Sequence, residues 1–194
     1  MKNFKLKDKY RFGFPEKSGL YDPQFEKDSC GVGLVANIKG IPSREIMDDA
    51  FHVNSKMDHR GGCGFEENTG DGAGILIALP DSFFRSQATK AGFELPEMGK
   101  YAVGNIFLPV NDKERDHCIS EFEKIIAQEN QKSIGWRDVP VDPDKADVGP
   151  ASRGAQPFIK QLFIQAEEDL SQEEFDRKLF LIRKRVSHLL RGDS

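Results

Sequence analysis

The chain has 194 residues, of which 31% are charged and 38% hydrophobic. This composition is typical of one water-soluble globular domain with a real core. The formal net charge of −4 excludes the basic face that nucleic-acid binding needs. No apolar run reaches the roughly 18–20 residues of a membrane-spanning helix, and no apolar stretch follows the N-terminal lysines as in a secretory signal. We therefore expect neither nucleic acid nor membrane as a partner.

The number and spacing of the cysteines indicate the cellular compartment of the protein. Cys30, Cys63 and Cys118 are an odd number and form no Cys-X-X-Cys pair. This usage disfavours a disulfide framework and a zinc site, and it fits the reducing cytoplasm. We accordingly expect a cytoplasmic protein without a bound metal in this chain.

The sequence changes from polar to apolar at Cys30, and the first predicted elements of secondary structure follow this residue. Residues 1–29 are polar, lack a clear period and are read as a leader. Residues 31–38 are apolar and β-branched, which predicts a buried strand. Ser43 is then the expected N-cap of a helix. The residues predicted to form the inner face of this helix share helical spacing and are Ile46, Ala50, Val53 and Met57.

The remaining elements follow a glycine-rich loop over residues 60–74. The apolar segments predicted as strands are 75–79, 101–108, 133–141, which carries Trp136, and 159–166. A helix is expected over residues 112–130, with Ile119, Phe122, Ile125 and Ile126 facing inward. Residues 141–157 contain three prolines and are expected to form a long loop.

The last predicted element is a helix that begins at Ser171, where Ser171 and Glu174 have the form of a capping box. Its predicted apolar stripe comprises Phe175, Leu179, Ile182, Val186 and Leu189. Two pairs of strands are adjacent in the predicted order, which favours antiparallel pairing over a repeated strand–helix–strand unit. The expected fold class is therefore α+β.

Cys30 stands at the junction between the leader and the first apolar segment. An arbitrary cysteine in such a place is most often a small core residue. The alternative is a nucleophile, because a cysteine that begins a chain has its own α-amine beside the thiol as a base. This chemistry requires cleavage of the Ser29–Cys30 bond, since an amide nitrogen is not basic. On this interpretation the chain as written is a precursor.

The glycine-rich loop is the second candidate for chemistry. Six glycines lie within residues 61–74, and they permit backbone conformations and close approaches that a Cβ would obstruct. A phosphate-binding loop is the obvious rival, but such a loop follows a strand and opens a helix. Here Gly74 leads into the predicted strand 75–79, and the lysine of a P-loop is missing. The sequence context therefore argues against a phosphate-binding function for this loop.

Three motifs in order resemble the opening of the class-II glutamine amidotransferases, which belong to the N-terminal-nucleophile hydrolases. They are Cys30-Gly-Val-Gly33, Asp58-His-Arg-Gly61 and Asp71-Gly-Ala-Gly74. Three further stretches look like the large subunit of glutamate synthase, namely Gly19-Leu-Tyr-Asp22, the insertion 62–70 and Gly135-Trp-Arg-Asp-Val-Pro140. The resemblance extends from about residue 19 to the C-terminal helix.

The resemblance implies a four-layer αββα sandwich of antiparallel sheets. It also implies a glutaminase, in which the Cys30 thiolate attacks glutamine and forms a glutamyl thioester. Ammonia would then serve to make glutamate from 2-oxoglutarate in the full enzyme, with FMN and an iron–sulfur cluster outside this chain. The implied partners are glutamine, the remainder of the large subunit and a small electron-donor subunit.

The resemblance assigns roles residue by residue. Arg60 matches an arginine close to the nucleophile, where a cation favours the thiolate. An ion pair with Asp71 that braces the loop is an equally good and compatible role. Asp71, Gly72 and Gly74 are expected to shape the site with Gly31. His59 is expected to be structural, and Cys63 and Cys118 are expected to be spectators.

Two parts of the family pattern are missing. The 194 residues contain no Asn-Gly pair, which forms the oxyanion hole in the family. The arginine stretch that binds the α-carboxylate of glutamine is also not found. Residues 30–194 are therefore expected to be the N-terminal portion of an incomplete amidotransferase domain. The alternative to a working glutaminase is an inactive truncated piece or an assembly module of the same family.

Overall fold

A computed structural model describes residues 17–20, 22, 31–57, 66, 72–167 and 170–192 of the chain. The chain divides into two compact units, Met1–Phe65 with Gly70–Ile75 and Glu66–Thr69 with Leu76–Ser194. Among the described residues no helix is long and apolar enough to cross a membrane.

The first unit contains helix α1 (Arg44–Lys56), which confirms the predicted helix. Ser43 is its N-cap, and the Ser43 hydroxyl accepts a hydrogen bond from the Ile46 amide at 3.3 Å. Glu45 in the first turn and Lys56 in the last turn complement the helix dipole. The four residues predicted for the inner face are all half-buried, although no residue of α1 is fully buried.

The strand predicted over residues 31–38 is wrong, since the structure shows no strand there. Val32, Leu34 and Ile38 are 93%, 90% and 102% exposed. The segment does contact α1 at Gly33, where an added Cβ would lie 2.7 Å from Met57 Cε and closer still to Val53. A strand also needs a hydrogen-bonded neighbour, and none is present among the described residues of this unit.

The strand predicted over residues 75–79 is wrong for the same reason. These residues form no ladder, and Leu76 is fully exposed. Only Leu79 packs against a core cluster. An apolar run indicates that a segment can be buried, but it does not supply the partner that a sheet requires.

The second unit is built on a three-stranded antiparallel sheet in the order β1-β3-β2. Its strands are β1 (Tyr101–Leu108), β2 (Lys132–Asp138) and β3 (Phe158–Gln165). Three of the predicted strands and their antiparallel pairing are thus confirmed. The central strand β3 pairs with β1 from Tyr101↔Gln165 to Leu108↔Phe158. Strand β2 pairs with β3 with a shift of register between Ser133 and Gly135.

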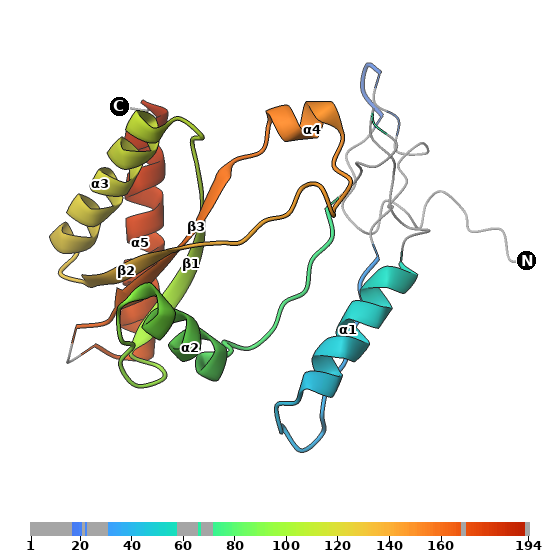
Figure 1. Cartoon of the computed structure of the whole chain (residues 1–194), viewed down its shortest axis with the longest axis horizontal. Coiled ribbons are helices and arrows are strands. Elements are labelled where there is room, and N and C mark those ends of the chain that lie inside the picture. Colours follow the sequence, from blue (N-terminus) through green and yellow to red (C-terminus); the bar gives the residue numbers. More distant parts are fainter. Residues whose placement is uncertain are drawn as a thin grey trace, which may run out of the picture. The chain divides into compact units, whose positions relative to one another are not determined.

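Helices cover both faces of this sheet (Figure 1). On β3, Leu162 and Ile164 pack into a cluster with α3 (Asp112–Gln128) and α5 (Gln172–Arg191). Phe163 points to the opposite face, as the alternation of a strand requires, and joins a second cluster with α2 (Asp81–Ala91). The described part of the second unit therefore has three layers, helices, sheet and helix.

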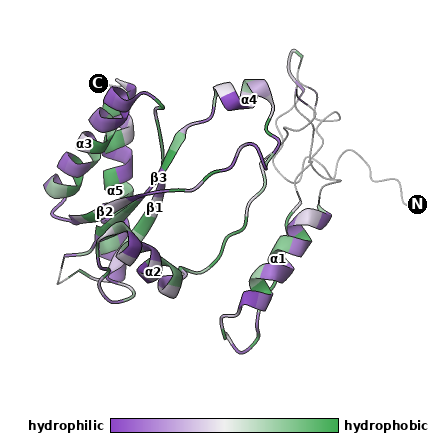
Figure 2. Ribbon diagram, in the orientation of Figure 1, coloured by the Kyte–Doolittle hydropathy of each residue, from purple (hydrophilic) through white to green (hydrophobic). Residues whose placement is uncertain are grey.

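The C-terminal helix shows how the sequence specifies packing. Ser171 and Glu174 form the predicted capping box. Phe175, Ile182 and Val186 are at most 2% exposed, and each such buried side chain contributes roughly 1.5–3 kcal/mol. Leu189, predicted for the same stripe, is 52% exposed and lies outside the core. Figure 2 shows the mixture of hydrophilic and hydrophobic residues along α3 and α5.

The ends of α3 and the helices α2 and α4 complete the description of the second unit. Helix α3 is capped by Asn111 and ends at Gln128, two residues earlier than predicted, before Asn130 adopts a left-handed φ of 57°. Helix α2 was not predicted, and the short α4 (Pro150–Gly154) lies inside the predicted long loop. The described residues are α+β with an antiparallel sheet, as expected, and the four-layer sandwich stays a prediction.

Candidate functional site

The predicted nucleophile and its nearest partners lie outside the described residues. This holds for Cys30, Arg60 and Asp71, and also for His59 and Cys63. Their roles stay predictions. The described neighbours Gly31, Gly72 and Gly74 are exposed. A Cβ added to Gly72 or Gly74 would meet nothing within 4 Å, so crowding by the described residues gives no reason for glycine at these two positions.

Gly33 holds the segment 31–38 close to α1. Three residues after Cys30, its backbone lies against Val53 and Met57 of α1 so closely that a methyl group would not fit without displacement. The alanine variant would force these side chains to move. Part of the Cys30-Gly-Val-Gly33 motif is thus explained by packing rather than by chemistry.

A contact across 85 residues connects the glycine-rich loop to α4. Glu66 Oε1 accepts a hydrogen bond from the Ala151 amide at 2.8 Å. Glu66 Oε2 accepts from the Ser152 amide at 3.2 Å and from the Ser152 hydroxyl at 3.1 Å. The N-cap residue of α4 is Gly149, which has no side-chain oxygen to cap these amides. The carboxylate of Glu66 therefore supplies the cap from a distant part of the sequence.

Arg153 stabilises α4 and the loop before it, which together hold the Glu66 carboxylate. Its guanidinium donates to the carbonyl oxygens of Val148 at 3.0 Å and Pro143 at 3.1 Å. It also pairs with Asp144 at 2.7 Å. The loop before α4 and the helix itself are thereby held as one piece, directly before the central strand β3.

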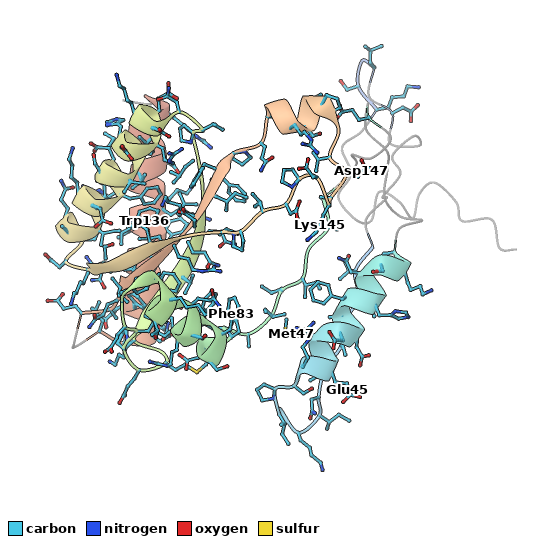
Figure 3. All side chains as sticks on the ribbon, in the orientation of Figure 1. Glu45, Met47, Phe83, Trp136, Lys145 and Asp147 are labelled. Carbon is cyan, nitrogen blue, oxygen red and sulfur yellow. The ribbon has the colours of Figure 1, made fainter. Side chains whose placement is uncertain are left out.

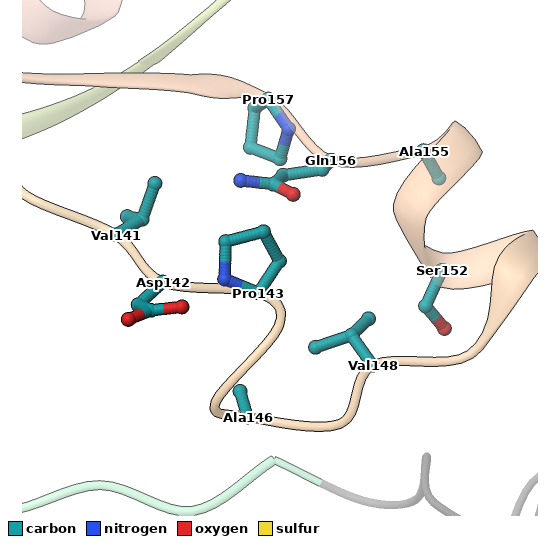
Figure 4. A pocket seen from close by; sticks show the side chains of 9 residues that line it. All are labelled: Val141, Asp142, Pro143, Ala146, Val148, Ser152, Ala155, Gln156 and Pro157. Atoms are coloured by element: carbon teal, nitrogen blue, oxygen red, sulfur yellow. The ribbon is translucent and has the colours of Figure 1, made fainter.

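The same loop and helix line an open pocket of about 480 Å³. Figure 4 shows its lining side chains, which are Val141, Asp142, Pro143, Ala146, Val148, Ser152, Ala155, Gln156 and Pro157. Asp142 is the one charged residue in this lining. An amino-acid ligand would need a cation for its carboxylate, so the lining does not suit glutamine.

Cys118 is the one cysteine that the structure describes, and it is half-buried in α3. Burial raises the pKa of its thiol, and the nearby Glu114 carboxylate raises this pKa further. Because the thiolate is the attacking species, Cys118 is poorly suited to be a nucleophile.

Trp136 and Arg137, which lie in a family-like stretch, serve the interior of the second unit. The Trp136 indole donates to Glu123 Oε1 at 2.6 Å and packs edge-on against Phe122. Figure 3 labels Trp136 among the side chains of this unit. Arg137 donates to the amide oxygens of Gln161 and Gln87, at 2.5 Å and 3.2 Å. Trp136 thus has a packing role, whereas Arg137 is held by amides and forms no salt bridge among the described residues.

The comparison with known proteins assigns the chain to a family. The sequence profile described as "Glutamine amidotransferases class-II" matches residues 30–193. The chain belongs to the class-II glutamine amidotransferases. The match begins at the residue that the motifs mark as the nucleophile, and it includes residues of both compact units.

Relatives of this amidotransferase are glutamate synthases. It is 40% identical to the glutamate synthase (NADPH) large chain of Bacillus subtilis (strain 168), over 90% of this chain and 11% of that protein. It is 39% identical to the glutamate synthase (NADH) of Saccharomyces cerevisiae, over 89% of this chain and 8% of that protein. It is 33% identical to ferredoxin-dependent glutamate synthase 1 of Arabidopsis thaliana, over 93% of this chain and 11% of that protein. The amidotransferase thus spans about a tenth of the length of these relatives.

The resemblance to glutamate synthase implied an iron–sulfur cluster outside this chain. Among the described residues no group of histidine, cysteine or acidic side chains is arranged to hold a metal ion. The whole sequence has three cysteines, whereas an iron–sulfur cluster of the usual kind takes four. The residues of this amidotransferase do not fit such a cluster.

Sequence reasoning missed the contact between Glu66 and α4. No periodicity links residues so far apart, and Gly149 and Ser152 lie in a segment predicted to be loop. The one available signal was the pair Gly149-Pro150, because proline is favoured at the first position of a helix.

Proposed function

We propose that this chain carries the glutaminase activity of a glutamate synthase, with Cys30 as the nucleophile. The observation that carries the proposal is the family match that begins at Cys30 and covers residues 30–193. The identity of 31–40% to glutamate synthases, over about nine-tenths of the chain, supports this kind of amidotransferase.

The chemistry requires a free α-amine on Cys30. The amine takes the thiol proton, and the thiolate attacks the side-chain carboxamide carbon of glutamine. The carbonyl oxygen takes up the electron pair as an oxyanion. Collapse of this intermediate breaks the carbon–nitrogen bond, and ammonia leaves with the proton returned by the ammonium group. Water then hydrolyses the glutamyl thioester to glutamate and restores the thiol.

Cleavage of the Ser29–Cys30 bond is part of the proposal, because it creates the base. Residues 1–29 are the leader, and residues 30–194 belong to the amidotransferase domain. Arg60 supplies a cation that favours the Cys30 thiolate, and Asp71, Gly72, Gly74 and Gly31 shape its surroundings. The sandwich of two antiparallel sheets is the proposed fold of this domain, and the sheet of the second unit is compatible with it.

The wider role follows from the relatives. Ammonia would pass to a second site, where 2-oxoglutarate is converted to glutamate with electrons from an FMN- and iron–sulfur-containing region. We propose that both groups are held by the rest of the enzyme, and the three cysteines of this chain, fewer than the four of a usual cluster, agree with this for the iron–sulfur cluster. A small subunit is one candidate for the electron donor. The cytoplasmic location expected from the cysteines stays a prediction.

Ammonia release from glutamine tests the proposal. The full enzyme that contains this chain should begin at Cys30, as verified by its intact mass, and should release ammonia that Cys30→Ala abolishes. Residues 30–194 alone, which lack the family's Asn-Gly pair and carboxylate-binding stretch, should release very little. Cys118→Ala is the matched control and should retain the activity, because the Cys118 thiol has a raised pKa and lies in α3. Undiminished release by Cys30→Ala would refute the proposal. Absence of release by the full enzyme that begins at Cys30 would favour the non-catalytic alternative.

A further inference from the structure

We propose that the free edge of β1 binds a fourth strand, which follows α5 in the polypeptide of the longer enzyme and runs antiparallel to β1. The inference rests on the proposed place of this chain in a glutamate synthase, because the occupant belongs to that enzyme. It does not depend on the chemistry of Cys30. The edge of β1 would thereby join the sheet of the second unit to the rest of the protein.

The backbone groups on the free edge of β1 follow from the ladder on its other side. The Ala166 amide donates to the Lys100 carbonyl oxygen at 2.9 Å and extends the β1–β3 register by one pair. In an antiparallel ladder, hydrogen-bonded residues alternate with residues whose N–H and C=O groups point away from the partner. The inward residues, whose backbone groups face β3, are Ala102, Gly104, Ile106 and Leu108. The outward residues, whose backbone groups point to the free edge, are Val103, Asn105 and Phe107.

The outward residues have no backbone hydrogen bond within the part of the chain that the structure describes. Strand β1 is the first of the order β1-β3-β2, so its second side has no neighbour among the described strands. Asn105 is exposed, and the Phe107 side chain is 68% exposed. A row of unpaired N–H and C=O groups is a template for a further strand.

The sequence of β1 lacks the features that protect an exposed edge. Its eight residues include no charged side chain and no proline, and its register with β3 is regular throughout. The opposite edge strand, β2, contains Lys132, Arg137 and Asp138 and has a shift of register. Charges and irregular register hinder the pairing of a further strand. Strand β2 thus has the character of an edge, and β1 has the character of an inner strand.

The first connection across the sheet sets the geometry. Strands β1 and β2 are parallel to each other, since both are antiparallel to β3. The chain passes from β1 through α3 and over β3 to β2, and α3 packs on the same face of the sheet as α5. Connections of this kind are right-handed in about 98% of cases. The path through α3 therefore fixes the direction in which a right-handed connection moves on this face.

Helix α5 begins a second connection in the opposite direction. It follows β3, which runs opposite to β1, and it covers the same face as α3. When the strand direction is reversed on one face, a right-handed connection moves the other way across the sheet. The path through α5 therefore leads from β3 over β1 to the free edge. The elements β1, α3, β2, β3 and α5 are the first five of a β-α-β-β-α-β arrangement, and its sixth element is the proposed strand.

The length and the end of α5 fit this path. The helix has 20 residues and is about 30 Å long, whereas the eight residues of β3 span about 27 Å. Figure 1 shows the C-terminal end of α5 beside the start of α3, which follows β1. Gly192, with a left-handed φ of 70°, is the C-cap at which α5 ends. The chain thus leaves α5 at the end of the sheet where a strand antiparallel to β1 has to begin.

A second copy of this chain is the rival occupant of the edge. Two β1 strands would be compatible with antiparallel pairing across a twofold axis, since neither carries a charge that repels the other. The strand after α5 is favoured because its connection arrives at the edge within the same molecule. Its effective concentration there is therefore high without a second chain.

Amide hydrogen exchange of β1, resolved to single residues by mass spectrometry, tests the inference. The full enzyme is compared with the chain of 194 residues. The outward amides should exchange at least about tenfold more slowly in the full enzyme. The inward amides are the internal control and should be protected in both proteins. Equal exchange of the outward amides in the two proteins would overturn the inference. Protection in the 194-residue chain that is lost on dilution would assign the edge to a second copy and overturn it too.

A pair of variants at Asn105 tests whether the protection comes from strand pairing. Asn105→Pro removes one outward N–H group and leaves the inward groups in place. In the full enzyme it should accelerate exchange at Val103 and Phe107 to the rates of the 194-residue chain. Asn105→Ala keeps the N–H group and should retain the protection. Retained protection in Asn105→Pro, or an equal loss in Asn105→Ala, would contradict pairing through this edge.

A photoreactive residue identifies the occupant in the full enzyme and keeps the inference testable if Asn105→Pro does not fold. Phe107→p-benzoylphenylalanine replaces an exposed ring, and a residue opposite it on a paired strand has its Cβ about 5 Å away. We expect a crosslink to the segment that directly follows α5. A crosslink to another segment or to a second copy would overturn the inference.

Ammonia release from glutamine, measured on the same preparations, keeps the two proposals apart. An active enzyme whose outward amides are unprotected would overturn the inference alone. An enzyme without glutaminase activity that shows the protection and the expected crosslink would refute the proposed chemistry of Cys30 and support the inference.

Discussion

Glu129 joins α3 to α5, and its replacement by glutamine should destabilise the second unit. It is 9% exposed and caps the C-terminus of α3. Its Oε2 accepts from Lys178 Nζ at 3.0 Å, and its Oε1 accepts from Arg185 at 2.6 Å. The two cations lie seven residues apart on one face of α5, so a single carboxylate holds two turns of that helix.

The expected loss of stability in Glu129→Gln depends on how exposed Lys178 and Arg185 are. Breaking a fully buried pair costs about 3–5 kcal/mol, because the remaining charge is left without a partner. Here the Lys178 and Arg185 side chains are 32% and 41% exposed, so water can solvate them in the variant. The cost should then be near that of hydrogen bonds to a charged group, about 2 kcal/mol for Glu129→Gln. Asp176→Asn changes an exposed carboxylate of the same helix and should cost less than about 0.5 kcal/mol.

Urea denaturation at several pH values measures this effect and its sign. Hydrogen bonds from Lys178 and then Arg185 lower the pKa of Glu129 from its usual value of 4.5. Its contribution to stability is therefore complete above about pH 4.5 and is lost as the pH falls through the lowered folded value. The gap between wild type and Glu129→Gln should close on acidification. A loss no larger than that of Asp176→Asn at pH 7, or a gap that widens in acid, would refute the reasoning.

Three further changes have definite outcomes. Gly135→Ala places a Cβ 2.7 Å from Phe93 Cδ1, and urea denaturation should show a loss of about 1–3 kcal/mol. Glu123→Ala removes the acceptor of the Trp136 indole. It should cost about 1–3 kcal/mol and alter the fluorescence of the one tryptophan in the chain. Burial, followed by a hydrogen bond to a carboxylate, raises the pKa of Tyr101 from 10.0 to about 12. Wild-type stability should therefore fall between about pH 10 and 12 more steeply than that of Tyr101→Phe, in denaturation measured across this range.

Elements with a partner inside the described chain could be predicted from the sequence. The strands β1, β2 and β3 combine apolar content with neighbours that pair with them. In helix α5 the capping box of Ser171 and Glu174 indicates where the helix starts. The spacing of Phe175, Ile182 and Val186 indicates which face is buried. In these cases local preference and packing agree.

The predictions of secondary structure were wrong where the local sequence pattern and the packing of the segment disagree. Residues 31–38 and 75–79 have the composition of strands, but among the described residues no strand pairs with them, so the pattern alone was misleading. Helix α2 has Pro80 as its N-cap residue and no side-chain cap hydrogen bond, and α4 also lacks one. Neither helix therefore begins with a side-chain capping signal, and α4, with five residues, is too short for a periodic pattern. Of the candidate site, Cys30 and Arg60 came from short motifs. The attachment of Glu66 to α4 depends on a contact between distant residues that no local pattern encodes.

The most direct test of the central claim is covalent labelling of the protein that begins at Cys30 by an electrophilic ketone analogue of glutamine, with the labelled peptide identified by mass spectrometry. We expect one label on Cys30, slowed by added glutamine in proportion to its concentration, and unchanged in Cys118→Ala. A label on Cys63 or Cys118 instead, or labelling of Cys30 that glutamine does not slow, would contradict the claim that Cys30 is the nucleophile of a glutamine-specific site.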